Sequence, residues 1–566
     1  MPVATLRRII RSVPSLLLAA GVACRGSDVS ERGATDADGS AGTGGTLIIV
    51  VPAEPTTLFP PLVSSTQGLA VISTIFEKLA DIGPALETYG DAGFVPRLAS
   101  SWQWAADSLS IAFTLDSLAR WHDGAPVRAE DVRYSFRAFT SDSVGSEAKS
   151  SLGNIDSVTV RDARTVEFWF KRRMPQQFFE ATYYVEILPS HLLDTIPLTR
   201  VASSAFARAP VGTGAFRFSR WEAGQRIEVI ADTANPRGRA KLDRVLWTIA
   251  PDFGAATIKL FSGDADFFEK VRPENLAQVA SSPTLRLIKN PALQYGFLGF
   301  NLRDPGSAAT AHPIFGDSLV RRALAMSVDR ERLVRNVFDS LGLVALGPAP
   351  RALISDTAAF RQMPFDVRAA AALLDSAGWR DSNADGVRDK NGVPLAFDLL
   401  VPNSSQNRQR YAVLLQEQWR PLGVRVTPRV LDVNALIERI ESHRFDAYMG
   451  GWQTTPGLRG AQQTWASTGS SNYGRYESPA FDALLDSALT TFDGAASRQY
   501  WARTFQQIID DAPAIWLYEE QTPIALHRRF IVPPLRADGW YYGLATWRVD
   551  LAQRIARDGI GVGSPP

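Results

Sequence analysis

The stretch from Phe94 to Phe136 decides how the rest of the chain is interpreted. It reads F-V-P-R-L-A-S-S-W-Q-W at 94–104, S-I-A-F-T-L at 110–115 and W-H-D-G-A-P-V-R-A-E-D-V-R-Y-S-F at 121–136. In the middle piece, Ile111 and Phe113 alternate with smaller or polar residues up to Leu115. Alternation with a period of two predicts a half-buried strand there.

The third piece predicts a turn followed by a helix. The segment His122-Asp123-Gly124 favours a turn, because glycine adopts positive φ without strain. Glu130 and Asp131 come next, and negative charge is favourable at a helix N-terminus. The apolar face of this helix is expected to consist of Val132, Phe136 and Phe139.

The order of these pieces resembles the family 5 extracellular solute-binding proteins, the peptide- and oligopeptide-binding receptors of ABC importers. Their shared block runs P-x-L-A-x-S-W, a strand, then F-H-D-G-x-P-[LV]-x-A-E-D-V-x-[FY]-S-[FW]. Further segments match in family order, and the resemblance extends roughly over residues 46–550. These segments are 46–60, Pro210–Phe216 (with Ala215 for the family's second Pro), Ser262–Asp266, Tyr295–Asn301 and Asp317–Arg330.

The resemblance implies an α/β, two-lobed periplasmic-binding-protein-like fold with an extra domain and a hinge between the lobes. By analogy, the first lobe takes residues 46–75, 205–300 and 520–566. The extra domain takes residues 76–204, and the second lobe takes residues 301–519. A chain of 566 residues is too long for one core, which agrees with several lobes.

The N-terminus predicts export. Three arginines precede an apolar run, Val13–Ala23, that is too short for a membrane-spanning helix, so residues 1–23 are expected to be a signal peptide. The only cysteine, Cys24, follows directly, and Gly21-Val22-Ala23-Cys24 resembles a lipobox. Residues 24–45 are therefore expected to be a lipid-anchored cysteine and a glycine-rich flexible tether. A plain signal peptide without lipidation is the alternative.

The charge balance excludes one class of partner. The formal net charge is +1, and without the leader 57 basic residues face 59 acidic ones. No basic excess exists to neutralise phosphates, so nucleic acid is not an expected partner. We expect a monomer at the cell envelope or in the periplasm.

The sequence provides little for catalysis, cofactors or metals. There is no G-x-S-x-G elbow, and the five histidines show no paired spacing such as H-E-x-x-H. The loop 381–392 places Asp381, Asn383, Asp385 and Asp389 in the order of a calcium loop, but Gly392 stands where a bidentate Glu is required. We therefore predict no catalytic residue, no cofactor and no metal site, and leave calcium binding by this loop open.

The resemblance places ligand contacts in the segment after Phe445. In the peptide-binding branch, an Asp a few residues after a Trp pairs with the peptide's ammonium group. Here Thr455 occupies that place after Trp452, and no Asp or Glu occurs from Ala447 to Tyr476. We therefore predict weak binding of simple peptides, unless a carboxylate from another lobe compensates.

The candidate ligand contacts are aromatic and neutral polar side chains from both lobes. The aromatic residues Trp452 and Tyr473 offer stacking faces, although core packing is their alternative role. The full set is Trp452, Gln453, Thr454, Thr455, Asn472, Tyr473, Ser65, Thr66 and Gln67.

The predicted function is an extracytoplasmic receptor of an ABC importer. It would bind a peptide-like or other small polar solute between the lobes and deliver it to the transmembrane permease. One alternative is an exported hydrolase, which would need a nucleophile and base that the sequence does not display. Another alternative is a sensing or chaperone lipoprotein without a permease.

Overall fold

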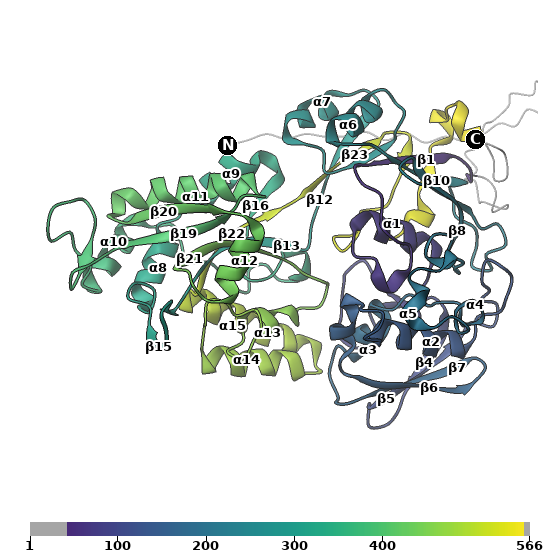
Figure 1. Cartoon of the computed structure of the whole chain (residues 1–566), viewed down its shortest axis with the longest axis horizontal. Helices are drawn as coiled ribbons and strands as arrows, with labels where there is room; N and C mark the ends of the chain where they lie inside the picture. Colours follow the sequence, from purple (N-terminus) through teal and green to yellow (C-terminus); the bar gives the residue numbers. More distant parts are fainter. Residues whose placement is uncertain (1–41, 560–566) are drawn as a thin grey trace, which may run out of the picture. The chain divides into compact units, whose positions relative to one another are not determined.

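A computed structural model describes residues 42–559, so the predicted signal peptide, Cys24 and most of the tether lie outside the described residues. Three larger sheets organise this part of the chain (Figure 1). The three sheets pack against separate hydrophobic cores, which agrees with the division into lobes expected from the length of the chain.

A seven-stranded sheet forms the first lobe, in the order β12-β23-β11-β1-β10-β9-β8. Strand β1 is parallel to both of its neighbours, β10 and β11, and the other pairs are antiparallel. Helices α1 (Thr66–Ile75), α6 (Phe253–Phe261) and α7 (Leu276–Ser281) accompany it. The strands are β1 (Thr46–Val51), β8 (Phe216–Glu222), β9 (Arg226–Ala231), β10 (Arg244–Ile249), β11 (Phe267–Glu269), β12 (Leu285–Asn290) and β23 (Thr522–His527).

The Phe94–Phe136 stretch lies in a smaller unit with a four-stranded antiparallel sheet, in the order β4-β5-β7-β6. The predicted strand is β5 (Ser110–Leu115), with Ile111, Phe113 and Leu115 buried, and the predicted helix is α2 (Ala129–Thr140). The other elements of this unit are β2 (Ala80–Ile82), β3 (Phe94–Pro96), β4 (Ala99–Trp104), β6 (Ile155–Asp162), β7 (Thr165–Phe170), α3 (Gln177–Tyr183), α4 (Ser190–Leu193) and α5 (Leu198–Val201).

The buried Asp131 explains why the motif spans the turn and the helix. Its carboxylate accepts hydrogen bonds from Trp121 Nε1 at 3.1 Å, from the Arg128 backbone at 2.8 Å and from the Ser190 backbone at 2.8 Å. A buried carboxylate needs such donors. The W-H-D-G to E-D-V spacing therefore holds the turn, α2 and α4 together.

His122 ties this unit to the first lobe. Its Nδ1 accepts from the Gly212 backbone at 3.3 Å, which leaves Nε2 to donate to the Gly214 carbonyl at 3.0 Å. Burial lowers the pKa of His122, so the ring stays neutral. The two glycines allow close packing, because a Cβ at Gly212 would lie 2.0 Å from the Ile75 carbonyl oxygen. The segment Gly212-Thr213-Gly214 thus has a structural role.

A six-stranded sheet forms the second lobe, in the order β16-β22-β13-β21-β19-β20. Both of its faces are covered, so alternate residues of one strand enter different cores. In β13 (Gln294–Phe300), Leu298 and Phe300 enter one core, and Tyr295 and Phe297 enter the other. The remaining strands are β16 (Gly342–Val344), β19 (Ala396–Pro402), β20 (Arg425–Leu431), β21 (Ala447–Gln453) and β22 (Ala514–Glu520).

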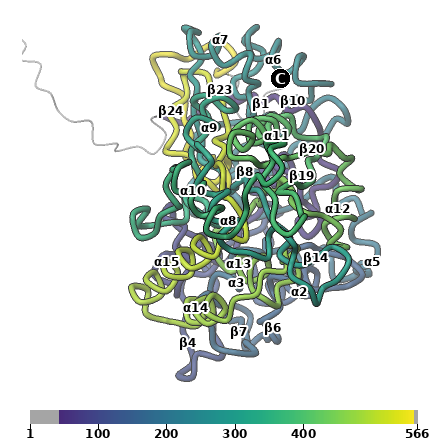
Figure 2. Tube along the Cα trace, turned by 90° about the vertical axis from the view of Figure 1, so that its left-hand side faces the viewer, coloured from purple at the N-terminus to yellow at the C-terminus, as the bar shows by residue number. Residues whose placement is uncertain are grey.

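Capping residues mark the start of helices in the second lobe. Asp317 caps α8 (Ser318–Met326) and Asp366 caps α10 (Val367–Ser376), each accepting a backbone N–H at 2.9 Å. The next helices are α9 (Arg330–Phe338), α11 (Gln406–Trp419) and α12 (Val433–Glu441). Three more, α13 (Gly460–Trp465), α14 (Pro479–Thr490) and α15 (Gly494–Asp511), lie together in both views (Figures 1 and 2).

The predicted boundary of the first lobe at residue 300 is wrong. Strand β13 lies between β21 and β22 in the second sheet, so the first-lobe segment ends with β12 at Asn290. The chain crosses between the two sheets at residues 291–293 and returns at Gln521, between β22 and β23. Tyr295 and Phe297 give β13 the sequence pattern of any buried strand. The local sequence therefore does not indicate which sheet the strand joins.

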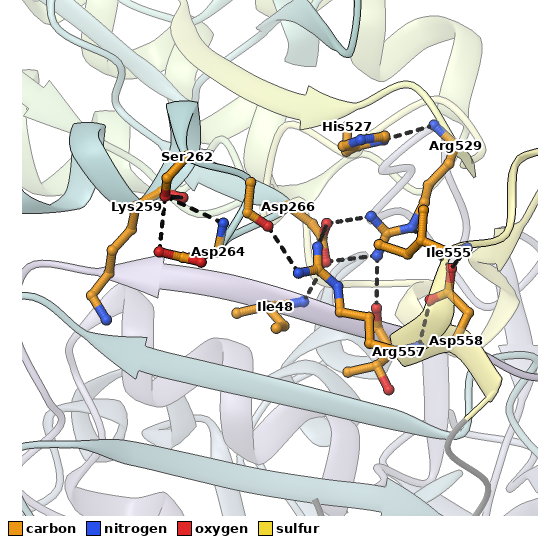
Figure 3. A network of polar contacts seen from close by, with 12 residues as sticks. Ile48, Lys259, Ser262, Asp264, Asp266, His527, Arg529, Ile555, Arg557 and Asp558 are labelled. Carbon is orange, nitrogen blue, oxygen red and sulfur yellow. Dashed lines mark hydrogen bonds and ion pairs between the residues drawn. The ribbon is translucent and has the colours of Figure 1, made fainter.

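A buried ionic cluster closes the first lobe where the described chain begins and ends (Figure 3). Arg529 is fully buried and pairs with Asp266 through both terminal nitrogens, one of them at 2.9 Å. Its Nε lies 3.2 Å from Asp558 Oδ2, and Arg557 also pairs with Asp266. Asp558 in turn accepts from the Thr46 backbone at 3.2 Å. The cluster thereby fixes the C-terminal segment against the start of β1.

Candidate ligand-binding site

A cavity of about 1540 Å³ adjoins the two crossing segments. First-lobe residues on its wall include Pro60, Thr66 and Lys270, and second-lobe residues include Asn403 and Arg410. Crossing residues 291–293 and Gln521 also line it. Pockets for drug-sized ligands measure about 300–1,000 Å³. This cavity therefore has room for a longer solute.

Four of the predicted ligand contacts line the cavity, namely Thr66, Gln453, Thr454 and Thr455. The residue after β21 is held to the crossing segment, because the Thr454 N–H donates to the Leu293 carbonyl at 2.7 Å. Thr455 Oγ1 lies 3.3 Å from the hydroxyl of Tyr184 in the extra domain. Neutral hydroxyls, without a carboxylate, thus occupy this wall.

The other five predicted contacts do not line this cavity, and four of them have structural roles. Ser65 caps α1 by accepting from Gly68 N at 3.1 Å, and Gln67 follows in the first turn. The rings of Trp452 and Tyr473 stack on one another with centroids 6.4 Å apart. Asn472 donates to the carbonyls of Ala466 and Tyr476 at 3.1 and 2.7 Å. Ligand contact by these five residues stays a prediction.

Carboxylates from outside the second-lobe segment 447–476 line the cavity, and sequence reasoning did not name them. Glu186 pairs with Lys78 at 3.4 Å, and Asp538 pairs with Arg536 at 2.7 Å. Glu269, the last residue of β11, accepts from Trp540 Nε1 at 3.1 Å. Glu520, the last residue of β22, also lines the cavity. They come from separate strands and loops, so no local pattern connects them.

Burial raises the pKa of both Glu269 and Glu520 above the ordinary value. For Glu269 the Trp540 hydrogen bond and the nearby Lys270 oppose this effect. For Glu520 the charges of Lys270 and Arg408 oppose it. In each case the cost of removing the carboxylate from water is the larger effect.

Aromatic side chains form another part of the wall, with Tyr183, Trp540, Tyr541 and Tyr542 as members. The ammonium group of Lys78 lies 4.5 Å from the Tyr183 ring centre and 5.6 Å from that of Tyr542. Such contacts stabilise a cation. The ammonium group of Lys78 therefore already occupies the cation position beside the Tyr183 and Tyr542 rings.

The loop 381–392 uses its polar side chains to build a turn. Asp381 accepts from Gly386 N at 3.0 Å, Asn383 accepts from Asp385 N at 3.0 Å, and Asp385 accepts from Val387 N at 2.8 Å. Asp389 accepts from Ser382 N at 3.0 Å, and this bond lowers its pKa. Between residues 42 and 559, no group of three His, Cys, Asp or Glu side chains is arranged to hold a metal ion.

These features define a class, that of two-lobed solute-binding proteins with a cavity at the crossing segments. The chain belongs to the bacterial extracellular solute-binding proteins, family 5, whose middle-region model matches residues 93–474. Members of this family are solute-binding receptors. Among the described residues, no helix is both long and apolar enough to cross a membrane.

Relatives cover nearly the whole chain. The oligopeptide-binding protein AppA of Bacillus subtilis is 28% identical over 516 residues, which cover 89% of this chain and 91% of AppA. The structure of AppA with a bound nonapeptide aligns with a TM-score of 0.68 and 25% identity, over 90% of this chain and 99% of that one. The substrate-binding protein CtaP of Listeria monocytogenes aligns with a TM-score of 0.76 and 20% identity, over 90% of this chain and all of CtaP (100%).

Proposed function

We propose that this chain is the extracytoplasmic receptor of an ABC importer and binds a peptide-like solute in the cavity at the crossing segments. The observation that carries the proposal is this cavity, lined by both lobes in a chain of the solute-binding family. AppA, which binds oligopeptides, supports the ligand class, since it aligns over 90% of this chain in three dimensions.

The proposed mechanism is hinge closure. A solute that contacts first-lobe residues such as Thr66 and second-lobe residues such as Asn403 favours the conformation in which both walls reach it. The permease would then recognise that conformation. No covalent chemistry is required, so the protein would not be an enzyme.

The first test identifies the solute directly. Mass spectrometry of material released from the purified, denatured protein should detect a peptide-like compound. Calorimetry with synthetic peptide pools of different lengths then measures affinity. The proposal fails if no peptide-like solute is released and no pool binds.

A pair of variants locates binding in the cavity. Ser404 is exposed and lines the cavity, whereas Ser281 is exposed at the end of α7 and does not line it. Ser404→Trp should weaken binding by about tenfold or more, and Ser281→Trp should change it by less than about twofold. Equal effects of both substitutions would place binding elsewhere.

The proposed location is the cell envelope, with Cys24 as the lipid attachment site. Cys24→Ser should release the exported protein into the soluble fraction and abolish labelling by a palmitate analogue. A wild-type protein that is soluble and unlabelled would indicate the plain signal peptide instead.

A further inference from the structure

Two carboxylates of the cavity lie at the junction where the chain returns from the second sheet to the first. Glu520 ends β22, Gln521 crosses, and Thr522 begins β23. Glu269 lies on β11 opposite Ile524 of β23. The first-lobe sheet and the second-lobe sheet thus each contribute one carboxylate to the lining of the same cavity.

Neither carboxylate forms an ion pair in the part of the chain that the structure describes. Glu269 accepts one neutral hydrogen bond, from Trp540, and Glu520 forms no ion pair. Lys78 pairs with Glu186 and Arg536 pairs with Asp538, whereas the charge of Lys270 acts on both carboxylates and that of Arg408 acts on Glu520. Lys270 and Arg408 offset only part of the cost of withdrawing these carboxylates from water, since burial remains the larger effect, and a cation that enters the cavity would reduce this cost further.

A third acceptor lies beside them. Asn290 ends β12 opposite Thr522 and lines the same cavity, although it is only 6% exposed. Its Nδ2 donates to the Arg536 carbonyl at 3.4 Å, which orients the amide and leaves Oδ1 without a donor. The buried amide therefore presents an unsatisfied acceptor, independent of the two carboxylates.

We propose that Glu269 and Glu520 bind a positively charged nitrogen group of the solute, an ammonium or a guanidinium, with Asn290 as an additional acceptor. This inference rests on the proposed function and assigns the end of the cavity that holds the charged group. An organic cation fits better than a metal ion, because no group of three metal-ligating side chains occurs within residues 42–559. The missing acid at Thr455 is then replaced by acids from outside the segment 447–476.

Binding of a cation by Glu269 and Glu520 should depend on pH. Both carboxylates are protonated at low pH in the folded and unfolded chain, and burial opposes their ionisation in the fold as the pH rises above the ordinary value of 4.5. A bound cation favours the ionised form. Binding of the cation should therefore strengthen with rising pH and release protons. The charges of Lys270 and Arg408 also favour the ionised form of Glu520.

The experiment compares a pool of synthetic pentapeptides that have free amino groups with the same pool after N-acetylation. Calorimetry on the full exported chain should show about tenfold or greater preference for the free-amine pool. Glu269→Gln and Glu520→Gln should each reduce that preference by about tenfold, while affinity for the acetylated pool changes by less than about twofold. Glu274→Gln is the matched control, because Glu274 lines the cavity, is exposed and lies 3.8 Å from Arg272.

A stability measurement separates this role from a structural one. Because both carboxylates are partly buried and form no ion pair, removing either charge should leave the melting temperature of the ligand-free Gln variants equal to or above that of wild type. If both pools lose affinity equally, or if neither Gln variant alters the preference, the inference is wrong while the proposed function stands. If neither pool binds wild type, the proposed function is what fails.

Discussion

Replacing Arg529 by Met should destabilise the first lobe strongly, because the guanidinium serves two buried carboxylates. Arg529 is 0% exposed and contacts Asp266, Asp558 and the Thr46 carbonyl, the last at 3.1 Å. After the substitution, Arg557 continues to neutralise Asp266, whereas Asp558 keeps only backbone donors. Removing one partner of a buried ion pair costs about 3–5 kcal/mol, and the remaining Arg557 places the expected loss near 3 kcal/mol.

The measurement must report the first lobe alone, since a chain of several lobes need not unfold in one step. Hydrogen exchange of the β1 amides does so, because the Ile48 N–H donates to Asp266 at 3.0 Å. Arg528→Met is the matched control at the exposed neighbouring position, with an expected change within about 0.5 kcal/mol.

A second substitution distinguishes charge from packing. Asp558→Asn in the Arg529→Met background should recover about 1 kcal/mol or more, because it removes the carboxylate that has lost its cation. If the β1 amides are as well protected from hydrogen exchange in Arg529→Met as in Arg528→Met, the cluster does not stabilise the lobe. If Asp558→Asn recovers nothing, the loss comes from side-chain volume and the electrostatic argument is refuted.

Two further predictions concern turns. Gly214→Ala should cost about 3 kcal/mol or more in urea unfolding, because its Cβ would lie 2.2 Å from the Thr74 carbonyl oxygen. Gly124→Ala, with φ of +89° but open space around its Cβ, should cost about 1–2 kcal/mol, and equal losses would contradict the packing argument. Calcium at millimolar concentration should change the melting temperature by less than about 1 °C, because side-chain oxygens of the loop 381–392 already accept hydrogen bonds from backbone N–H groups. A larger rise would show that the loop opens to bind the ion.

Local sequence predicts much of this fold because short-range physics determines much of it. The strand at 110–115, the turn at Gly124 and the helix capped near Asp131 follow from alternation, backbone freedom and capping. The caps Asp317 and Asp366 set their helices for the same reason. By contrast, β13 pairs with β21 and β22, which are more than 140 residues further along the chain. Its sheet membership is a long-range property, so the boundary at 300 was misplaced.

The candidate site shows the same division. The segment 453–455 lines the cavity and was named from its resemblance to the family's ligand-contacting segment. Glu269 is the last residue of β11, whose sequence indicates only a buried strand. Glu520 is the last residue of β22 and lies 251 positions further along the sequence. Their proximity depends on β23 pairing with β11 directly after the chain crosses. Only the assembled sheets bring the two carboxylates to one wall, so composition and spacing within a segment contain no sign of it.

The position of these carboxylates connects ligand charge with lobe closure. Glu269 belongs to the first-lobe sheet and Glu520 to the second-lobe sheet, with one crossing residue between Glu520 and β23. On the proposed assignment, a single cationic group attracts one carboxylate from each sheet and so favours the conformation that brings both within reach. An acid at position 455 would bind the same group from the second lobe only. On the same assignment, carboxylates at the junction would let the charged end of the solute act on the crossing segments, and neutral solutes would have to close the lobes through hydroxyl and backbone contacts alone.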